Sequence, residues 1–245
     1  MVRRLPVVIR LDGRAFHTVT RGLKKPYDEI FHNAMNATLK YLCENIQGCK
    51  LGYTQSDEIT LVLTDYDTLT TDAWFDYSVQ KMCSISASMA TLAFNKYFAE
   101  YSKDTLRRIN NCFTCTTEEA KYAEALERVI KNGAMFDSRC FNIPEDEVTN
   151  CVLWRQQDAT RNAIQMLGQC HFSDKQLKGK KNNDIQDMLM LEKGINFNDM
   201  PAAFKRGVCC KKNEDGKWLI DTEIPIFSKD REYVEKTFRP KTEEN

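Results

Sequence analysis

The chain has 245 residues, of which 42% are hydrophobic, and its 35 lysines and arginines balance its 35 aspartates and glutamates. This length and hydrophobic content are sufficient for a buried core and argue against overall disorder. The zero net charge excludes a protein that coats nucleic acid by bulk electrostatics, although local basic clusters can still bind phosphates.

The first part of the chain alternates short strands with a helix. Residues 6–12 are a short run of β-branched apolar residues that predicts a core strand ending in a carboxylate. Residues 27–46 carry apolar side chains at helical spacing, with two acids in the first turn, and predict a helix with one buried face. Residues 49–54 and 58–64 predict two strands of a hairpin, joined by a tight polar turn at residues 55–57.

Two long helices and another strand are predicted in the middle of the chain. Residues 74–101 contain few helix breakers and many small residues, as in a long helix that packs closely on a sheet. Residues 136–143 predict a strand that ends at a proline, and residues 145–170 predict a second long helix. We expect Trp154 to face the core, because a tryptophan in a long helix is more often buried.

The later part of the chain is less regular. We expect a short helical segment within residues 174–193 and a small hairpin within residues 208–220. The order strand, helix, strand, strand, helix, strand predicts an α+β fold with a ferredoxin-like antiparallel sheet and helices packed on one face.

The ten cysteines are scattered through a chain that shows neither a membrane span nor a signal peptide. They fit reduced thiols in a cytoplasmic protein better than a disulfide framework. Cys112 and Cys115 are the nearest approach to a zinc motif, but no second pair stands at a suitable spacing. We therefore do not expect a zinc site.

Two aspartates are expected at one edge of the predicted sheet. Asp12 ends the first strand and Asp57 lies in the turn of the hairpin, so antiparallel pairing brings them together. A two-metal phosphoryl-transfer site needs rigid carboxylates that hold two Mg²⁺ ions about 4 Å apart, and Mg²⁺ prefers few protein oxygens plus substrate phosphates. Glu58 offers a third source of oxygen ligands. An isolated Asp-Gly would instead bond only to local backbone amides.

The residues that follow Asp12 suit a phosphate. Gly13 permits close approach of the backbone, and the amides of the turn can meet phosphate oxygens. Arg14 and His17 add side-chain donors. A phosphate-binding turn beside a metal carboxylate is chemically coherent.

Three motifs in the first sixty residues resemble those of the tRNA-His guanylyltransferase superfamily. They are R-L-D-G-R-A-F-H at residues 10–17, K-P-Y-D at 25–28 and Y-T-Q-S-D-E at 53–58, in the order and at about the spacing of that family. The segments F-D-S-R at 136–139, W-R-Q-Q-D at 154–158 and F-K-R-G at 204–207 extend the resemblance over most of the chain.

The resemblance implies a palm-like catalytic domain at residues 1–145. It also implies that residues 146–245 form a mostly helical, basic extension with the small hairpin, which packs on the palm and contacts tRNA. Such a protein is a cytoplasmic nucleotidyltransferase that uses two Mg²⁺ ions, ATP and GTP and assembles as a homotetramer.

The resemblance also implies roles for individual residues. Asp12 and Asp57 would hold both metal ions together with the carbonyl of Gly13, and Glu58 would assist catalysis. Lys25 and Ser56 would meet triphosphate oxygens. Asp28 would lie near the guanine edge. The full set of nucleotide-binding residues implied by the motifs is Arg14, Ala15, Phe16, His17, Lys25, Asp28 and Ser56.

One segment departs from the family pattern. Enzymes that add the obligatory guanylate to tRNA-His carry H-I-N-N shortly after the W-R-Q segment, whereas this chain has Thr160-Arg161-Asn162-Ala163. The chain thereby resembles the guanylyltransferase-like repair polymerases, which restore truncated tRNA 5′ ends by template base pairing. The implied reaction activates a 5′-monophosphate with ATP, and the 3′-hydroxyl of an incoming nucleoside triphosphate then attacks the activated phosphate.

Several basic or polar residues in the later half are candidates for contacts to tRNA or to the activating nucleotide. We select Arg139, Arg155 and Asn162, although Arg155 can equally pair with its neighbour Asp158. The remaining candidates are the clustered lysines Lys178, Lys180 and Lys181, which would meet the RNA backbone or would simply be solvated.

Three other functions remain open. The first is a tRNA-His guanylyltransferase that adds the −1 guanylate. The second is a nucleotide cyclase, which also pairs two metal carboxylates on such a sheet but does not need a basic later half. The third is a non-catalytic RNA-binding palm, which would be expected to lack Asp12 or Asp57, and both are present.

Overall fold

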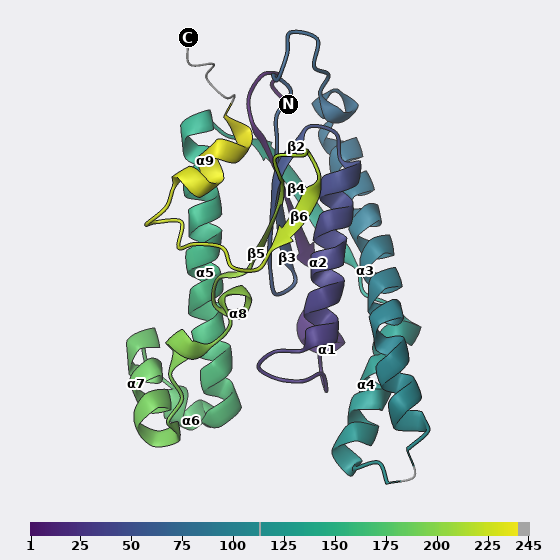
Figure 1. Ribbon diagram of the computed structural model, residues 1–245, viewed down its shortest axis with the longest axis vertical. Coiled ribbons are helices and arrows are strands. Elements are labelled where there is room, and N and C mark those ends of the chain that lie inside the picture. The colour runs from purple at the N-terminus through teal and green to yellow at the C-terminus, as the bar shows by residue number, and fades with distance from the viewer. Residues whose placement is uncertain (113, 240–245) are drawn as a thin grey trace.

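The computed structural model describes residues 1–112 and 114–239. One antiparallel sheet lies at its centre, with the strand order β4-β1-β3-β2-β5-β6 (Figure 1). The strands are β1 (Val7–Gly13), β2 (Cys49–Gln55), β3 (Glu58–Leu63), β4 (Phe136–Asn142), β5 (Val208–Lys212) and β6 (Trp218–Asp221). The predicted α+β fold with an antiparallel sheet is confirmed.

Helices surround the sheet. They are α1 (Phe16–Val19), α2 (Glu29–Asn45), α3 (Val79–Asn110), α4 (Thr117–Asn132), α5 (Glu145–His171), α6 (Asp174–Leu177), α7 (Asn182–Lys193), α8 (Ala202–Arg206) and α9 (Glu232–Phe238), with 3₁₀ turns η1 (Trp74–Tyr77) and η2 (Phe197–Asp199). The helix predicted at residues 74–101 begins later and runs further, as α3. Among the described residues, no helix has the length and apolar character that crossing a membrane requires.

The helices of the first half cover one face of the sheet. Val7, Ile9 and Leu11 of β1 point to this face and pack in a cluster with α2, α3 and α4. Gly52 of β2 permits the close approach of α2, because a Cβ at this position would lie 2.6 Å from Leu39 Cδ1. The predicted packing of the palm helices on one face is thus present.

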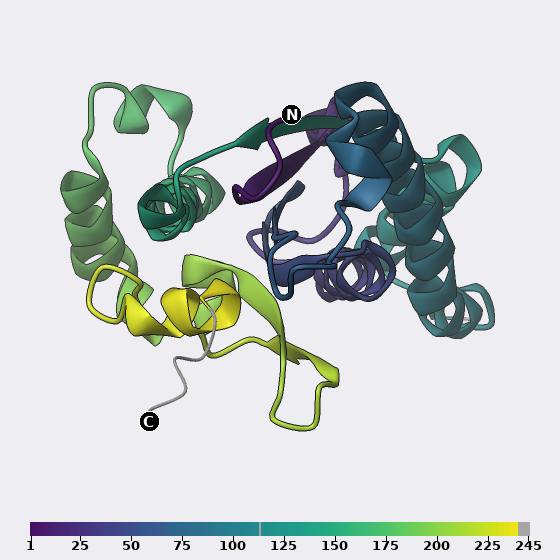
Figure 2. The ribbon, with the colours of Figure 1, turned by 90° about the horizontal axis from the view of Figure 1, so that it is seen from above.

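The other face is covered by α5 and α9, as Figure 2 shows from above. Leu51 and Val62 of the sheet pack there against Val148 and Val152 of α5 and Val234 of α9. The predicted small hairpin is β5–β6, and it continues the sheet by pairing with β2 rather than standing apart. Division of the chain into domains at residues 145 and 146 stays a prediction.

The second half of α5 extends past the sheet and carries a smaller apolar cluster. Ile164 and Leu167 of α5 pack there with Leu189 of α7, Phe197 of η2 and Phe204, which lies in α8. In Figure 1, α7 stands at the end of α5 that is farther from β4, whereas α8 lies beside the middle of α5. The cluster fixes the C-terminal half of α5 in place.

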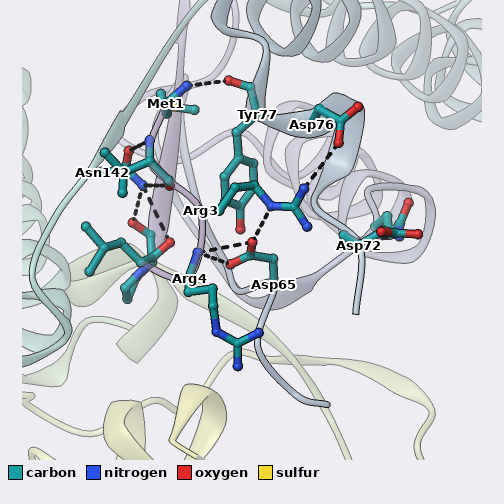
Figure 3. Close-up of polar contacts among 12 residues, drawn as sticks. Met1, Arg3, Arg4, Asp65, Asp72, Asp76, Tyr77 and Asn142 are labelled. Atoms are coloured by element: carbon teal, nitrogen blue, oxygen red, sulfur yellow. Dashed lines mark hydrogen bonds and ion pairs between the residues drawn. The ribbon is translucent and has the colours of Figure 1, made fainter. Parts of the chain in front are cut away.

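A buried carboxylate ties the first residues to the loop after β3 (Figure 3). The Asp65 side chain is 0% exposed, and it accepts hydrogen bonds from Arg3 Nε at 2.8 Å and from the Arg4 amide at 2.9 Å. Arg3 also pairs with the exposed Asp76 at 3.2 Å. These contacts fix the start of β1, the strand that carries Asp12 near its other end.

Candidate active site

Three acidic residues meet where β1 and β2 end and β3 begins. Asp12 lies directly opposite Glu58 in the antiparallel register, and Asp57 occupies the turn between β2 and β3. Ser56 precedes it with a left-handed φ of 53°, and the Gly13 amide donates to the Asp57 carbonyl at 3.2 Å. The structure therefore brings Asp12 and Asp57 to one edge of the sheet, as the register of the predicted strands implies.

Negative charge is concentrated at this edge. Burial raises the pKa of Asp57 to about 6, and the nearby carboxylates of Asp12 and Glu58 contribute in the same direction. Burial also raises the pKa of Asp12, again with contributions from the neighbouring acids Glu58 and Asp137. Both carboxylates would be stabilised in their charged form by a bound cation.

The donor set fits Mg²⁺ held jointly with a substrate. Within residues 1–112 and 114–239, no three side chains of His, Cys, Asp or Glu converge in a way that could hold a metal ion by themselves. Mg²⁺ is commonly bound by one or two carboxylates together with substrate phosphates and water. Asp12, Asp57 and the Gly13 carbonyl satisfy that requirement, and their roles as ligands stay a prediction.

Glu58 differs from the two aspartates because arginines hold it. Its Oε2 accepts from Arg10 Nη2 at 3.1 Å and from Arg155 Nη1 at 3.2 Å. Arg155 also pairs with Asp158 at 3.2 Å, as expected from their spacing on α5. Arg155 therefore links α5 to the acidic end of these strands and, together with Arg10, fixes the position of Glu58.

A cavity of about 280 Å³ opens beside Asp57, between the hairpin turn, the start of α2 and the second half of α5. Apolar side chains, including Leu23, Met166 and Phe204, line it together with polar groups. This mixture suits a ligand that carries both a base and phosphates. The predicted site residues that line the cavity are Lys25, Asp28, Ser56, Asp57, Glu58 and Asn162.

Asp28 already has three hydrogen-bond donors. Its buried carboxylate caps α2 by accepting from the Phe31 amide at 2.9 Å, and it also accepts from the Lys24 amide at 3.0 Å and the Tyr122 hydroxyl at 2.9 Å. These bonds fix the loop before α2 against α4. The contact of Asp28 with a guanine edge stays a prediction, alongside this structural role.

The turn after Asp12 is only partly available to a ligand. The Phe16 side chain is buried in the core, so only its backbone can meet a nucleotide. Ala15 adopts a left-handed φ of 54°, and the Arg14 amide donates to the Met135 carbonyl at 2.9 Å. The side chains of Arg14 and His17 are exposed.

Arg155 contacts Glu58 and Asn162 lines the cavity, and the other predicted RNA-contact residues lie in two further places. Arg139 is exposed on the edge strand β4 and pairs with Asp137 at 3.5 Å. Lys178 and Lys180 line a surface hollow beside α6, and Lys181 directly precedes α7. Lys178, Lys180 and Lys181 do not line the cavity beside Asp57.

Trp154 does not face the core. It is 62% exposed, so the expectation of a buried tryptophan is wrong. The buried positions of this part of α5 are Val148, Thr149, Val152, Leu153 and Gln156, and Trp154 lies on the opposite side of the helix.

Comparisons with known proteins agree with this geometry. A family model described as tRNAHis guanylyltransferase matches residues 1–144. A bacterial tRNA(His) guanylyltransferase-like protein solved in complex with ATP is 44% identical, with a TM-score of 0.83, over 98% of this chain and 92% of that chain. A bacterial structure in complex with GTP is 38% identical, with a TM-score of 0.74, over 97% and 91%. The tRNA(His) guanylyltransferase of Saccharomyces cerevisiae is 28% identical over 215 residues, which are 82% of this chain and 80% of that protein.

Proposed function

Because this chain belongs to the tRNA-His guanylyltransferase family of nucleotidyltransferases, we propose that it extends tRNA at the 5′ end in the 3′-to-5′ direction and uses a template to do so. Its physiological reaction would be the repair of truncated 5′ ends. ATP would activate a 5′-monophosphate, and template-paired nucleoside triphosphates would then be added.

The observation that carries this proposal is the packing of residues 160–163. The Thr160 hydroxyl donates to the Lys205 carbonyl at 2.8 Å and thereby joins α5 to α8. Ala163 is 2% exposed and belongs to the apolar cluster around Phe204. The histidine and the second asparagine of the H-I-N-N pattern would fall at these two packing positions. This arrangement supports an enzyme that does not select tRNA-His through that motif.

The chain's own residues would bind and orient the reactants. Lys25 and Ser56, which line the cavity, would donate to triphosphate oxygens, while Arg155 keeps Glu58 in place. Mg²⁺ held by Asp12 and Asp57 would neutralise phosphate charge and polarise the attacking and leaving oxygens. Catalysis of phosphoryl transfer is expected to come mainly from such positioning and electrostatic stabilisation.

Two displacements at phosphorus complete the proposed reaction. In the first, an oxygen of the RNA 5′-monophosphate attacks the α-phosphorus of ATP, so that an RNA 5′-adenylate forms and pyrophosphate leaves. In the second, the 3′-hydroxyl of the incoming nucleoside triphosphate attacks the 5′-phosphorus of the RNA, loses its proton, and AMP leaves. The bacterial relatives solved with ATP and with GTP support both nucleotides as ligands.

The test compares two RNA substrates in the presence of Mg²⁺, ATP and all four nucleoside triphosphates. One is a tRNA that lacks a template-paired 5′ residue, and the other is full-length tRNA-His. We expect extension of several truncated tRNAs, reduced by about 100-fold or more in Asp57→Ala because the metal site loses a carboxylate. Asp187→Ala, an exposed acid on α7, is the matched control and should retain activity.

The second candidate function is addition of the −1 guanylate to tRNA-His. It is favoured by the S. cerevisiae relative, whose name states that activity. Addition confined to full-length tRNA-His would establish it and refute the repair proposal. Assembly as a homotetramer and cytoplasmic location stay predictions, which sedimentation and imaging can check.

A further inference from the structure

One side chain on the wall of the cavity beside Asp57 has no polar partner. It is the imidazole of His32, which lies in the first turns of α2 and is partly buried. Within residues 1–112 and 114–239, neither of its ring nitrogens has a hydrogen-bond partner. Polar groups that are withdrawn from water in folded proteins are nearly always hydrogen-bonded. The free nitrogens of His32 therefore indicate that a ligand in the cavity supplies the partner.

Two aromatic neighbours fix the orientation of this imidazole. Tyr27 stacks on its face, with 3.8 Å between the ring centroids and 8° between the ring planes. Phe31 meets it edge to face, with centroids 5.3 Å apart and planes at 70°. Imidazole nitrogens form hydrogen bonds in the plane of the ring, so a partner must lie beside the ring and not on the face that Tyr27 covers. The cavity is the space beside His32 that a ligand can enter.

The cavity has an acidic end and an apolar end. Asp57 and Glu58 lie at the acidic end, and Glu58 pairs there with Arg155 of α5. Met166, which also lines the cavity, lies about 16 Å farther along the helix than Arg155. Phosphates that share Mg²⁺ with the aspartates must lie at the acidic end. A nucleobase would then lie toward Met166.

His32 belongs to the apolar end. Phe204 of α8 lines this end and packs in the apolar cluster around the second half of α5. Tyr27 contacts Phe204, with ring centroids 6.1 Å apart, and it also stacks on His32. Asp28, and not Asp57, is the acid whose charge acts on the imidazole. His32 therefore stands where the nucleobase is expected, away from the metal carboxylates.

The chemistry of His32 matches an atom that the purines share. Burial lowers its pKa to about 4, so the imidazole is neutral at pH 7 and carries one N–H donor. Adenine and guanine differ at position 6, but both present the acceptor N7 on the same edge. Pyrimidines have a C–H group at the corresponding place. A single donor at His32 can therefore favour ATP and GTP over CTP and UTP.

We propose that His32 donates its N–H to N7 of the purine nucleotide that activates the RNA 5′ end, and thereby selects purines for the first step; this rests on the proposed function. The template selects each nucleotide that is added, so a purine-specific contact to that nucleotide would hinder repair. The activating nucleotide has no template partner, and the protein alone must select it. Tyr27 keeps the imidazole in the required plane.

The test measures the affinity of the full chain for ATP and for 7-deaza-ATP, in which a C–H group replaces N7. Titration calorimetry is done with Mg²⁺ and without RNA, so that no transfer to RNA occurs. We expect the wild type to bind ATP about 5-fold more tightly than 7-deaza-ATP, the effect of one hydrogen bond. His32→Phe keeps a ring that can stack on Tyr27 but removes both nitrogens. This variant should bind ATP no more tightly than 7-deaza-ATP.

A control and a kinetic measurement separate this contact from a structural effect. His171→Phe replaces an exposed histidine at the end of α5, outside the cavity, and should keep the wild-type preference. In adenylylation of a 5′-monophosphate tRNA, His32→Phe should raise the KM for ATP about 5-fold and change kcat by less than about 2-fold. If His32→Phe binds both nucleotides more weakly but keeps the preference for ATP, the proposal is overturned, because another group then contacts N7.

Nucleotide addition to a truncated tRNA is assayed with the same samples, so that the two proposals fail separately. If the wild type extends the RNA but binds ATP and 7-deaza-ATP equally, the inference about His32 is wrong and the proposed function stands. If the wild type prefers ATP and His32→Phe loses this preference, but the wild type does not extend the RNA, the repair function is wrong and the contact to N7 stands.

Discussion

The buried carboxylate of Asp65 should contribute far more to stability than its exposed neighbour Asp76, although both pair with Arg3. Asp65→Ala removes the acceptor of the Arg3 guanidinium and of the Arg4 amide, at 2.8 and 2.9 Å. Its side chain is 0% exposed, so few water molecules can replace it. Asp76 is 89% exposed, and water replaces its carboxylate readily.

The expected loss follows from these contacts. A hydrogen bond to a charged group contributes about 1.5–3 kcal/mol, and a fully buried amide left without an acceptor costs about 1–3 kcal/mol, which is an upper bound for the part-buried contact of the Arg4 amide. The Arg3 side chain is partly exposed, which keeps the total near the lower end. We therefore expect Asp65→Ala to lower the free energy of unfolding by about 3 kcal/mol, or the Tm by roughly 6–12 °C. Asp76→Ala should cost about 0.5 kcal/mol or less.

Urea unfolding followed by circular dichroism measures both variants against the wild type. The slope of the free energy against urea concentration should be equal in all three proteins, which would show that only stability has changed. Equal losses in Asp65→Ala and Asp76→Ala would refute the reasoning, because burial would then not determine the contribution of these carboxylates.

Three further predictions concern residues near the cavity. Burial lowers the pKa of His32 to about 4, from an ordinary value of 6.5, so protonation below pH 6.5 favours the unfolded chain. Between pH 7 and pH 5 the free energy of unfolding should therefore fall by about 2 kcal/mol more in the wild type than in His32→Phe. Urea titrations of both proteins at both pH values check this. Arg155→Ala should slow nucleotide addition by about 10-fold or more because Glu58 loses one of its two arginine partners and its link to α5, whereas Arg161→Ala, which removes an exposed side chain, should not change the single-turnover rate. Ala163→Asn should lower the free energy of unfolding by about 2 kcal/mol because it buries an amide among apolar side chains, and a thermal melt that matches the wild type would contradict this.

The sequence was most informative where local periodicity and pairing agree. The β-branched apolar run of β1 and the alternating apolar residues of β3 predicted both strands, and antiparallel pairing predicted that Asp12 and Asp57 come together; the structure shows Asp12 opposite Glu58. The long helix α5 was also predicted within one residue of its ends. A helix was missed at α4, although Thr116 and Glu119 form a capping box that marks its start.

Long-range packing accounts for what could not be predicted. The first half of α5 packs on the sheet and the second half on α7 and α8, so its apolar pattern does not define one inward direction, and the exposure of Trp154 was missed. The pairing of β5 with β2 depends on a free strand edge far away in the sequence. The cavity likewise depends on how α2 and α5 approach the hairpin turn, which no local pattern specifies.

The most direct test of the account is a change of template. A truncated tRNA is prepared in four versions that differ only in the 3′-strand base opposite the missing 5′ residue, and each is incubated with the protein, Mg²⁺, ATP and all four nucleoside triphosphates. Sequencing of the products identifies the added residue. Template-directed repair predicts the Watson–Crick complement in all four cases. Addition of guanylate regardless of the opposing base would contradict the account and assign the chain a guanylate-specific activity.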